Sequence, residues 1–523
     1  MNKHISPFLY YSRKIYIYIV IIFFILLVSL NYRNFLTVNR YLSEFGIKKL
    51  FTNYHLFLTD FPSFLTKTIS LHEGDTQSAW SSFYFLLPLF LFLKSTGGLC
   101  LKNLYFFNFA VSIANLVVFY KVCEYAFKRQ VAQISVLYLA FSAWFFEFTM
   151  SYCYRNLTFL ISLILIYVMF RCLKEQKIIN YLFLGVVIGV SMYFYGTIRY
   201  LWLPVVMLIF NRKFNSIPRI IYFLIGLTPL LVFSLSGTNF KKLFDEENIF
   251  WAADPRVIYS SWLLRLSDNL KSVFKAFAGG YIVIPHAHLM NALLVVPFIW
   301  GMVWIIKKRK INSYNLLLWI FIAITVLPAF ITYAHTQPRR FVLYPVPMYM
   351  LIGIGMRQLV KRACHINMKM LRILSICLIL CASVYIIMSE FNFIRSSMTT
   401  NERDFGFIKL SKELSTSLIR GKIYYLQEVP HRLYGDPYDC EKYLLMLALG
   451  DYRSDFSVTQ VNSLDNLAFE KEIYIVKSPL IQEDYFQDIL HKQGFSFKEL
   501  FASPFSGNFI DSDNGFRVYK LQK

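Results

Sequence analysis

Residues 103–120 read NLYFFNFAVSIANLVVFY, a run of 18 residues without a charged side chain. The core of a bilayer can be crossed only by segments that satisfy their own backbone hydrogen bonds, and an α-helix of about this length does so. Similar apolar runs recur along the chain from Ile15 to Met388. The repetition predicts a polytopic α-helical membrane protein.

The composition supports this class. The 523 residues are 56% hydrophobic and 16% charged, with a mean hydropathy of +0.47, which is too apolar for a soluble protein of this length. The net charge of +23 lies mainly in short loops between apolar runs, where it sets orientation, so no nucleic-acid partner is expected. The eight cysteines lack the paired spacing of a metal site or disulfide framework.

About eleven runs are predicted to cross the membrane, at residues 15–30, 103–122, 131–149, 156–170, 181–195, 200–210, 220–236, 289–306, 314–333, 341–356 and 373–388. A twelfth run, Trp80 to Leu93, is short for a crossing and is assigned to a helix in the outer interface. Six basic segments then share the cytoplasmic side, as the positive-inside rule requires. They hold 21 Lys and Arg against the two acids Glu124 and Glu175, at residues 1–14, 121–130, 171–180, 211–219, 307–312 and 357–372.

The chain divides into two predicted domains. Residues 1–397 form the transmembrane domain, with long outer loops at 31–102 and 237–288. In residues 398–523, helical patterns at 405–418, 440–449 and 483–492 alternate with β-rich runs at 422–426, 473–476 and 516–521, which is typical of a small α/β domain. The odd span count places this domain outside and the N-terminus in the cytoplasm. The expected location is the cell membrane, and specifically a bacterial inner membrane.

Two carboxylates in the first outer loop are candidates for acid–base chemistry. Glu73 and Asp75 lie two positions apart around Gly74, so on an irregular backbone they could converge on one site. The alternative for Asp75 is a helix N-cap before residues 76–80.

Four arginines lie at predicted outer ends of spans, where the positive-inside rule disfavours cations: Arg155, Arg199, Arg339 and Arg340. Guanidinium groups match the oxygens of a phosphate, so the set predicts a phosphate-binding site. For a single arginine, the alternative is that its side chain extends toward lipid head groups.

His286 and His288 flank Ala287 at the outer start of a span, and His72 precedes the acidic pair. His-x-His with a carboxylate is a conceivable metal set, but the spacing is loose. No metal is assigned, and His286 and His288 are kept as substrate-binding candidates.

The order of these pieces resembles the polytopic GT-C glycosyltransferases, in the branch of protein O-mannosyltransferases and aminoarabinose transferases. The matching stretches extend from residue 1 to about 390. They include residues 73–80 (EGDTQSAW), 141–145 (FSAWF), 185–195 (GVVIGVSMYFY) followed by Arg199, and 338–347 (PRRFVLYPVP).

The resemblance implies transfer of a sugar from a polyprenyl-phosphate carrier to a lipid, glycan or protein acceptor at the outer face of the membrane. It also implies an acidic catalytic residue in the first loop, and Asp75 occupies that position. Many relatives follow this Asp with Glu, whereas here Thr76 follows and Glu73 precedes. Tyr195 ends one matching stretch and is counted with the substrate-binding residues.

Glycosyl transfer needs a base for the incoming hydroxyl and cations for the departing phosphate. Asp75 and the arginines fit these roles, and a single displacement with inversion is expected. No cofactor is required, and a divalent cation is optional. Two other classes stay open: an O-antigen-type polymerase or ligase, which would use a diphosphate-linked donor, and a lipid or glycan transporter.

Overall fold

The structure is a computed structural model. It describes residues 7–30, 47–70, 83–99, 101–150, 154–191, 193–194, 196–210, 216–229, 267, 271, 290–308, 312–325, 343–399, 422–426, 457–461, 473–477, 487, 490–491, 496–503 and 516–522.

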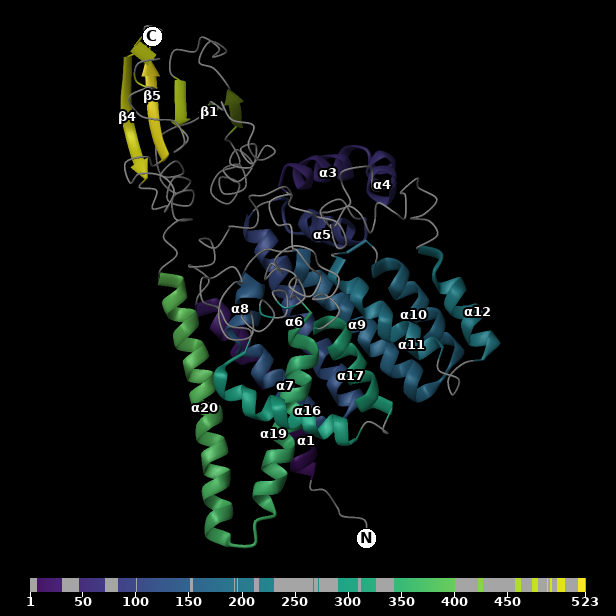
Figure 1. Cartoon of the computed structure of the whole chain (residues 1–523). Helices are drawn as coiled ribbons and strands as arrows, with labels where there is room; N and C mark the ends of the chain where they lie inside the picture. Colours follow the sequence, from purple (N-terminus) through teal and green to yellow (C-terminus); the bar gives the residue numbers. More distant parts are fainter. Residues whose placement is uncertain are drawn as a thin grey trace.

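The first part of the chain is helical (Figure 1). Its elements are α1 (Pro7–Leu30), α3 (Ile47–Thr59), α4 (Phe61–Ser70), α5 (Phe83–Ser95), α6 (Leu101–Ala126), α7 (Arg129–Ala140), α8 (Ala143–Met150), α9 (Tyr154–Glu175), α10 (Ile178–Ser191), η2 (Gly196–Leu201), α11 (Trp202–Ile209), α12 (Ile217–Gly226), η3 (Ala292–Leu294), α16 (Val295–Lys307), α17 (Asn312–Thr325), α19 (Pro345–Cys364) and α20 (Lys369–Thr399).

Every predicted span overlaps a helix. By length and composition, three of the described helices could cross a membrane: Asn103–Ala126, Asn156–Glu175 and Lys369–Asn392. Shorter apolar helices occupy most of the other predicted spans, among them Tyr16–Ser29 and Ala292–Lys307. The count of eleven spans stays a prediction.

The predicted span 131–149 is not one helix, because α7 ends at Ala140 and α8 begins at Ala143. Ser142 explains the break. Its hydroxyl accepts the backbone N–H of Phe145 (3.2 Å), as an N-cap does, and donates to the carbonyl of Leu139 (2.8 Å). Hydropathy alone does not detect such a local competition for hydrogen bonds.

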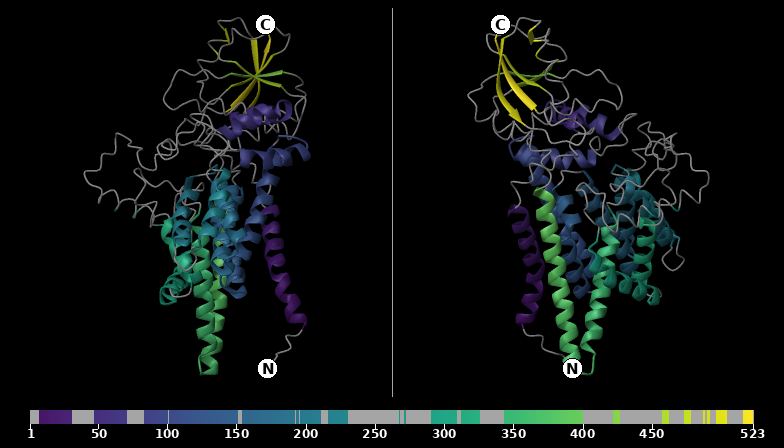
Figure 2. Two further views of the ribbon diagram at one scale, coloured as in Figure 1. Left: turned by 90° about the vertical axis from the view of Figure 1, so that its right-hand side faces the viewer. Right: turned by 60° about the vertical axis from the view of Figure 1, so that its left-hand side comes forward.

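Two helices, α3 and α4, form inside what the sequence predicts as an outer loop. Aromatic side chains hold them to α5, with the ring of Phe90 5.4 Å from Phe57 and 5.6 Å from Phe64. Asp60 caps α4 by accepting the N–H of Ser63 (3.1 Å), and the hydrogen bonds from Ser63 lower the pKa of Asp60. These helices lie across one end of the bundle (Figure 2).

Helix α5 corresponds to the run assigned to the outer interface, and it lies transverse to the long helices (Figures 1 and 2). It ends at Ser95, and the turn that follows contains Gly97 and Gly98, whose φ values of 98° and 108° suit glycine. The side-chain amide of Asn103 donates to the carbonyls of Thr96 (3.0 Å) and Gly98 (2.8 Å).

Small residues bring the central helices into close contact. Helix α19 packs on α16 and α7, and it begins at Pro345, a residue suited to a first helical position. A Cβ at Gly355 would overlap the carbonyl oxygen of Pro297, and one at Gly353 would overlap the hydroxyl of Ser135. Backbone-to-backbone approach of this kind is how helices pack in membranes.

The end of the chain carries a five-stranded sheet of order β2-β1-β3-β5-β4, built from β1 (Lys422–Leu426), β2 (Ser457–Val461), β3 (Ile473–Lys477), β4 (Ser496–Ser503) and β5 (Phe516–Gln522). β2, β1 and β3 are parallel, whereas β5 and β4 are antiparallel to their neighbours. The predicted strands at 422–426, 473–476 and 516–521 coincide with β1, β3 and β5. The predicted helical runs at 405–418 and 440–449 lie outside the described residues, and of the run 483–492 only residues 487, 490 and 491 are described, all three as helical.

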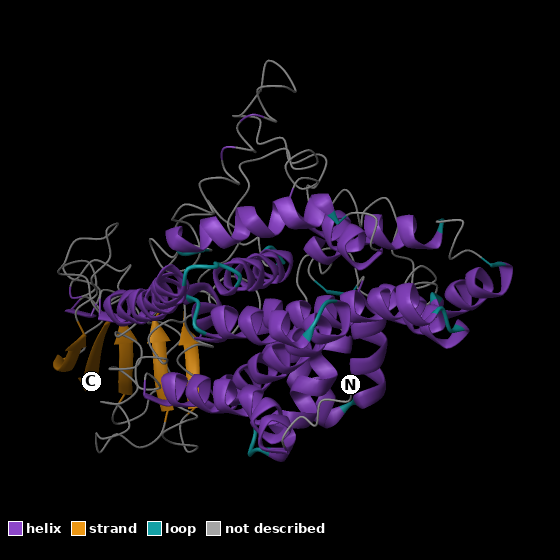
Figure 3. Ribbon diagram, turned by 90° about the horizontal axis from the view of Figure 1, so that it is seen from below, coloured by secondary structure: helices purple, strands orange, loops and turns teal. Residues whose placement is uncertain are grey.

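The sheet lies beyond the end of α20, at the end of the bundle opposite the N-terminus (Figure 1). Viewed from below, it is offset to one side of the helices (Figure 3). This is the end at which α3, α4 and α5 lie. Because the predicted number of spans is odd and the N-terminus is predicted to be cytoplasmic, this end is predicted to be extracytoplasmic.

Candidate functional site

Most of the predicted site residues lie outside the described residues: Glu73, Asp75, Tyr195, His286, His288, Arg339 and Arg340. Arg155 lies in the first turn of α9, but its side chain is outside the described set. Arg199 is described in full. The structure therefore informs this site mainly through the elements that flank these residues.

Arg199 lies in η2, the 3-10 helix between α10 and α11. Its neighbours Ile198, Tyr200 and Leu201 are buried, which fixes the short helix in the core, while Arg199 itself is half-buried. η2 packs against α9, α11 and α17. The predicted span 200–210 therefore begins with a 3-10 turn, and Arg199 lies within that turn rather than ahead of a helix.

A tyrosine pair links the acidic loop to this segment. Tyr84 follows the loop as the second residue of α5, and its ring lies 4.8 Å from that of Tyr193, in an edge-on arrangement at 62°. The Tyr193 hydroxyl donates to the carbonyl of Pro229 (3.3 Å). The start of α5, which follows the segment that contains Glu73 and Asp75, therefore packs against the residues that precede η2 and Arg199.

Buried amides fix the start of α9 beside Arg155. Asn156 is 1% exposed, and its Nδ2 donates to Oδ1 of Asn108 and to Oγ of Ser112, both at 2.7 Å. Asn115 donates to the carbonyl of Asn156 (3.1 Å). Such bonds between helices contribute roughly 0.6 kcal/mol each on average. They position the backbone of Arg155 against α6.

The segment that carries Arg339 and Arg340 is anchored at both ends. It connects α17, which ends at Thr325, to α19, and the buried Tyr344 hydroxyl donates to the carbonyl of Thr325 (3.1 Å). Since α17 packs against η2 and α9, the flanks of all four predicted arginines belong to neighbouring elements.

A buried carboxylate that the sequence analysis did not identify lies at the same end of the bundle. Glu390 of α20 is 4% exposed; its Oε2 accepts the N–H of Ala143 (2.7 Å) at the start of α8, and its Oε1 accepts Nδ2 of Asn291 (3.2 Å). A helix N-terminus favours an anion. Asn291 in turn caps η3 through the N–H of Leu293 (3.1 Å).

Glu390 therefore joins α8, α20 and the start of the η3–α16 unit, which directly follows the segment with His286 and His288. In the sequence, Glu390 can be recognised as a single carboxylate near the end of a long apolar run. We define this set of contacts, made by Glu390, Ala143 and Asn291, as the Glu390 clamp.

Contacts at the opposite end are consistent with helices that alternate in direction. The hydroxyl of Tyr16 donates to the carbonyl of Gln133 (3.1 Å), and Nε of Arg357 donates to Oε1 of Gln130 (3.0 Å). These residues belong to the ends of α1, α7 and α19 that the charge pattern predicts to be cytoplasmic. Among the described residues, no group of three or more His, Cys, Asp or Glu could hold a metal ion.

Comparisons with known proteins confirm the predicted resemblance to the GT-C glycosyltransferases. The family model of dolichyl-phosphate-mannose-protein mannosyltransferases matches residues 83–236, which extend from α5 past α12. The apo structure of ArnT from Cupriavidus metallidurans is similar over 95% of this chain and 97% of that one, with a TM-score of 0.51 and 11% identity. At this identity the likeness concerns the fold.

Two further structures match more weakly. ArnT from the same organism bound to undecaprenyl phosphate has a TM-score of 0.49, 10% identity and coverage of 95% and 97%. The Archaeoglobus fulgidus oligosaccharyltransferase with zinc and sulfate has a TM-score of 0.44 and 8% identity, covering 88% of this chain and 69% of that one. No curated protein sequence gives a match.

Proposed function

We propose that this chain is an integral-membrane glycosyltransferase that moves a sugar from a polyprenyl-phosphate-linked donor to a lipid, glycan or protein acceptor on the extracytoplasmic face. The observation that carries the proposal is the family-model match over residues 83–236, which include Arg155, Tyr195 and Arg199. The family's name specifies a dolichyl-phosphate sugar, and undecaprenyl phosphate, the molecule bound in one ArnT structure, is likewise a polyprenyl phosphate.

The chemistry follows from the residue types. The Asp75 carboxylate accepts the proton of the acceptor hydroxyl, whose oxygen forms a bond to the anomeric carbon as the bond from that carbon to the phosphate oxygen breaks. The electron pair of the broken bond leaves with the polyprenyl phosphate. Attack from the face opposite the phosphate inverts the anomeric centre.

The departing phosphate gains negative charge, and guanidinium groups stabilise it. We assign this role to Arg155, Arg199, Arg339 and Arg340. The packing of η2 against α9 and α17 supports a common site for them. Tyr195, His286 and His288 are assigned to sugar or acceptor contacts, with Glu73 as a second acid beside Asp75.

No cofactor takes part in this scheme, and a divalent cation is optional because the donor carries a single phosphate. Chelation by EDTA should therefore leave transfer intact. Transfer that stops on chelation and returns with Mg²⁺ or Mn²⁺ would contradict the scheme.

The test is transfer by the purified protein in nanodiscs, with radiolabelled polyprenyl-phosphate sugars as donors. Arg199→Lys keeps the charge but loses the planar fork, so donor affinity should fall, with each lost charge-assisted hydrogen bond worth roughly 1.5–3 kcal/mol. Arg155→Lys should behave alike.

Arg219→Lys is the matched control, because Arg219 lies toward the other end of the bundle, over the ring of Tyr181 (5.6 Å) and bonded to Gln176 (3.3 Å). If all three variants bind the donor equally well, the assignment of Arg155 and Arg199 to the phosphate site is wrong. Transfer only from diphosphate-linked donors would favour the polymerase or ligase class.

A further inference from the structure

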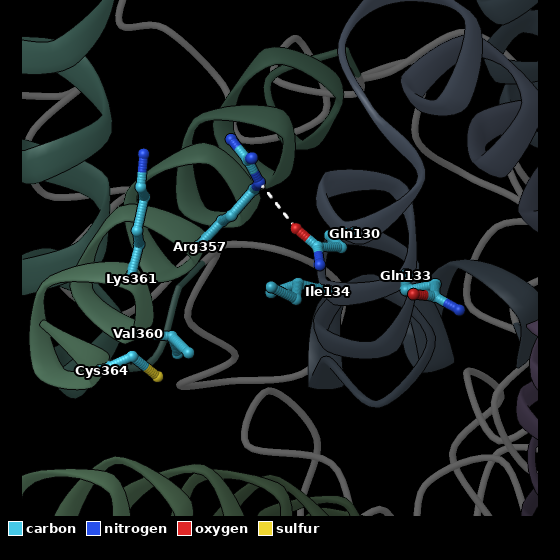
Figure 4. Close-up of a pocket in the computed structure, with 7 residues that line it drawn as sticks. All are labelled: Gln130, Gln133, Ile134, Arg357, Val360, Lys361 and Cys364. Carbon is cyan, nitrogen blue, oxygen red and sulfur yellow. Dashed lines mark hydrogen bonds between the residues drawn. The ribbon is translucent and has the colours of Figure 1, made fainter. Parts of the chain in front are cut away.

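A cavity of about 510 Å³ opens between α7 and α19 (Figure 4). The end of α19 that lines it lies at the end of the bundle opposite the sheet (Figure 1). Its lining includes Gln130, Ile134, Arg357, Val360, Lys361 and Cys364. Arg357 and Lys361 extend in the same direction from α19, one helical turn apart (Figure 4). We call this cavity the α7–α19 pocket.

The acids near this end of the bundle are already paired. Glu124 lies 3.1 Å from Lys121 and 3.9 Å from Arg129. Glu175 lies 3.0 Å from Arg171 and 3.7 Å from Lys177. Neither carboxylate reaches the α7–α19 pocket.

Two neighbouring cations are in contact with aromatic rings. Arg362 stacks 4.2 Å from the ring centre of Trp300, and Lys308 lies 5.5 Å from that of Trp304. Arg357 and Lys361 differ from both, because within the described part of the chain neither has a carboxylate or an aromatic partner. Like charges four residues apart on a helix repel. Among the described residues, no carboxylate neutralises these two positive charges, so the pocket suits an external anion.

The polar contacts of the pocket favour an oxygen-rich anion. Oε1 of Gln130 accepts Nε–H of Arg357 (3.0 Å) and so orients the guanidinium, whose remaining N–H groups form a fork that matches a phosphate. The amide NH₂ of Gln130 is a further donor. Lys361 supplies a compact charge beside them.

The position of the pocket along the helices favours a membrane lipid as the source of the anion. Cys364 ends α19, and the apolar segment of α20 begins five residues later, at Lys369, so the pocket lies at the level where the membrane interior begins. Ile134 and Val360 give it an apolar wall. Met370, Ile373 and Leu374 of α20 expose apolar side chains at the start of this segment. A phosphate at this depth, with hydrocarbon next to it, is that of a membrane lipid.

We propose that the α7–α19 pocket binds the phosphodiester head group of an anionic phospholipid, from the leaflet that the charge pattern predicts to be cytoplasmic. Arg357 and Lys361 hold the phosphate, and the acyl chains extend along the adjoining apolar surface. The site is separate from the proposed transfer site and does not depend on it.

The experiment is native mass spectrometry and thermal melting of the full chain, in nanodiscs of phosphatidylglycerol or of phosphatidylcholine. Phosphatidylglycerol should be retained and should raise Tm relative to phosphatidylcholine. Arg357→Gln with Lys361→Gln should weaken retention by roughly tenfold or more, since charge-assisted bonds are lost. Arg362→Gln with Lys308→Gln removes the same charge from the same end and should retain the lipid.

Equal retention by the two double variants would overturn the proposal. So would equal protection by inorganic phosphate, which would make the site one for a soluble anion, or displacement of phosphatidylglycerol by a polyprenyl phosphate, which would assign the pocket to the carrier.

A measurement on the unmodified protein covers the case in which the double variant fails to fold. Cys364 is exposed and lines the pocket, so phosphatidylglycerol should slow its labelling by a maleimide, as measured by peptide mass spectrometry. Labelling of Cys364 after denaturation sets the level of complete reaction, whereas Cys377 lies within the predicted span 373–388 and should stay unlabelled in both lipids. Equal labelling of Cys364 in both lipids would refute occupancy of the pocket.

Discussion

Replacement of Glu390 tests how the last long helix is held to the bundle. Glu390→Ala leaves the buried N–H of Ala143 without its acceptor, at a cost of about 1–3 kcal/mol. It also removes the charge-assisted bond from the Asn291 amide, which keeps its bond to Ser389 Oγ (2.8 Å). The carboxylate also interacts favourably with the start of α8, while its removal cancels the cost of burying a charge. We expect a net loss of about 3 kcal/mol in the free energy of unfolding.

Glu390→Gln separates the contribution of charge from that of shape. The glutamine carbonyl can still accept from Ala143, but its NH₂ group faces the NH₂ of Asn291, so the expected loss is about 1–2 kcal/mol. Thermal unfolding in detergent micelles should rank the wild type above Glu390→Gln, and Glu390→Gln above Glu390→Ala, with several degrees in Tm between the extremes.

Ser383→Ala is the control on the same helix. It removes the neutral hydrogen bond between helices that Ser383 Oγ accepts from the Tyr138 hydroxyl (2.7 Å) and the local bond that Ser383 Oγ donates to the carbonyl of Ile379 (2.8 Å), and should cost about 1 kcal/mol. If Glu390→Ala melts no lower than Ser383→Ala, the Glu390 clamp does not stabilise the bundle and our reasoning fails.

Three further outcomes are expected. Asp75→Asn keeps shape but removes basicity, so turnover should fall by roughly 10²-fold or more with donor binding nearly intact, and Glu73→Gln should be milder; the reverse order would exchange their roles. Gly355→Ala places a Cβ against the carbonyl of Pro297, so α16 and α19 must separate, at a cost of about 1–3 kcal/mol in thermal unfolding; an unchanged Tm would contradict this contact. Cysteines introduced at residues 307–310 and at Gly435 should be labelled from opposite sides of the membrane, and labelling from one side would reject the predicted topology.

The positions of the long helices could be predicted because a helix that crosses the bilayer core needs a long run of apolar residues. The same emphasis on runs hid α3 and α4, which are short and amphipathic. Leu50, Tyr54 and Phe57 are spaced by four and three residues and are all buried, so a helical period was present in the sequence. The length of apolar runs predicts a loop here, because charged and polar residues interrupt the run.

The candidate site shows where sequence reasoning ends. Arg199 could be selected because the positive-inside rule disfavours a cation at an outer helix end. Its position in a 3-10 helix, in contrast, depends on packing among α9, α11 and α17. The Glu390 clamp joins residues 143, 291 and 390, whose proximity exists only in the folded bundle. Likewise, the contact of Tyr84 with Tyr193 bridges segments that are distant in sequence.

Helix α20 has 31 residues, which at 1.5 Å per residue is about 46 Å, whereas a bilayer core is about 30 Å thick. The excess carries the helix past the Glu390 clamp toward the sheet. Each residue of a helix also rotates the chain by about 100° around the helix axis. The number of residues between Glu390 and Thr399 therefore sets the direction, around that axis, in which the chain leaves the bundle. One residue inserted there would leave the clamp in place and swing that exit by more than a quarter of a turn.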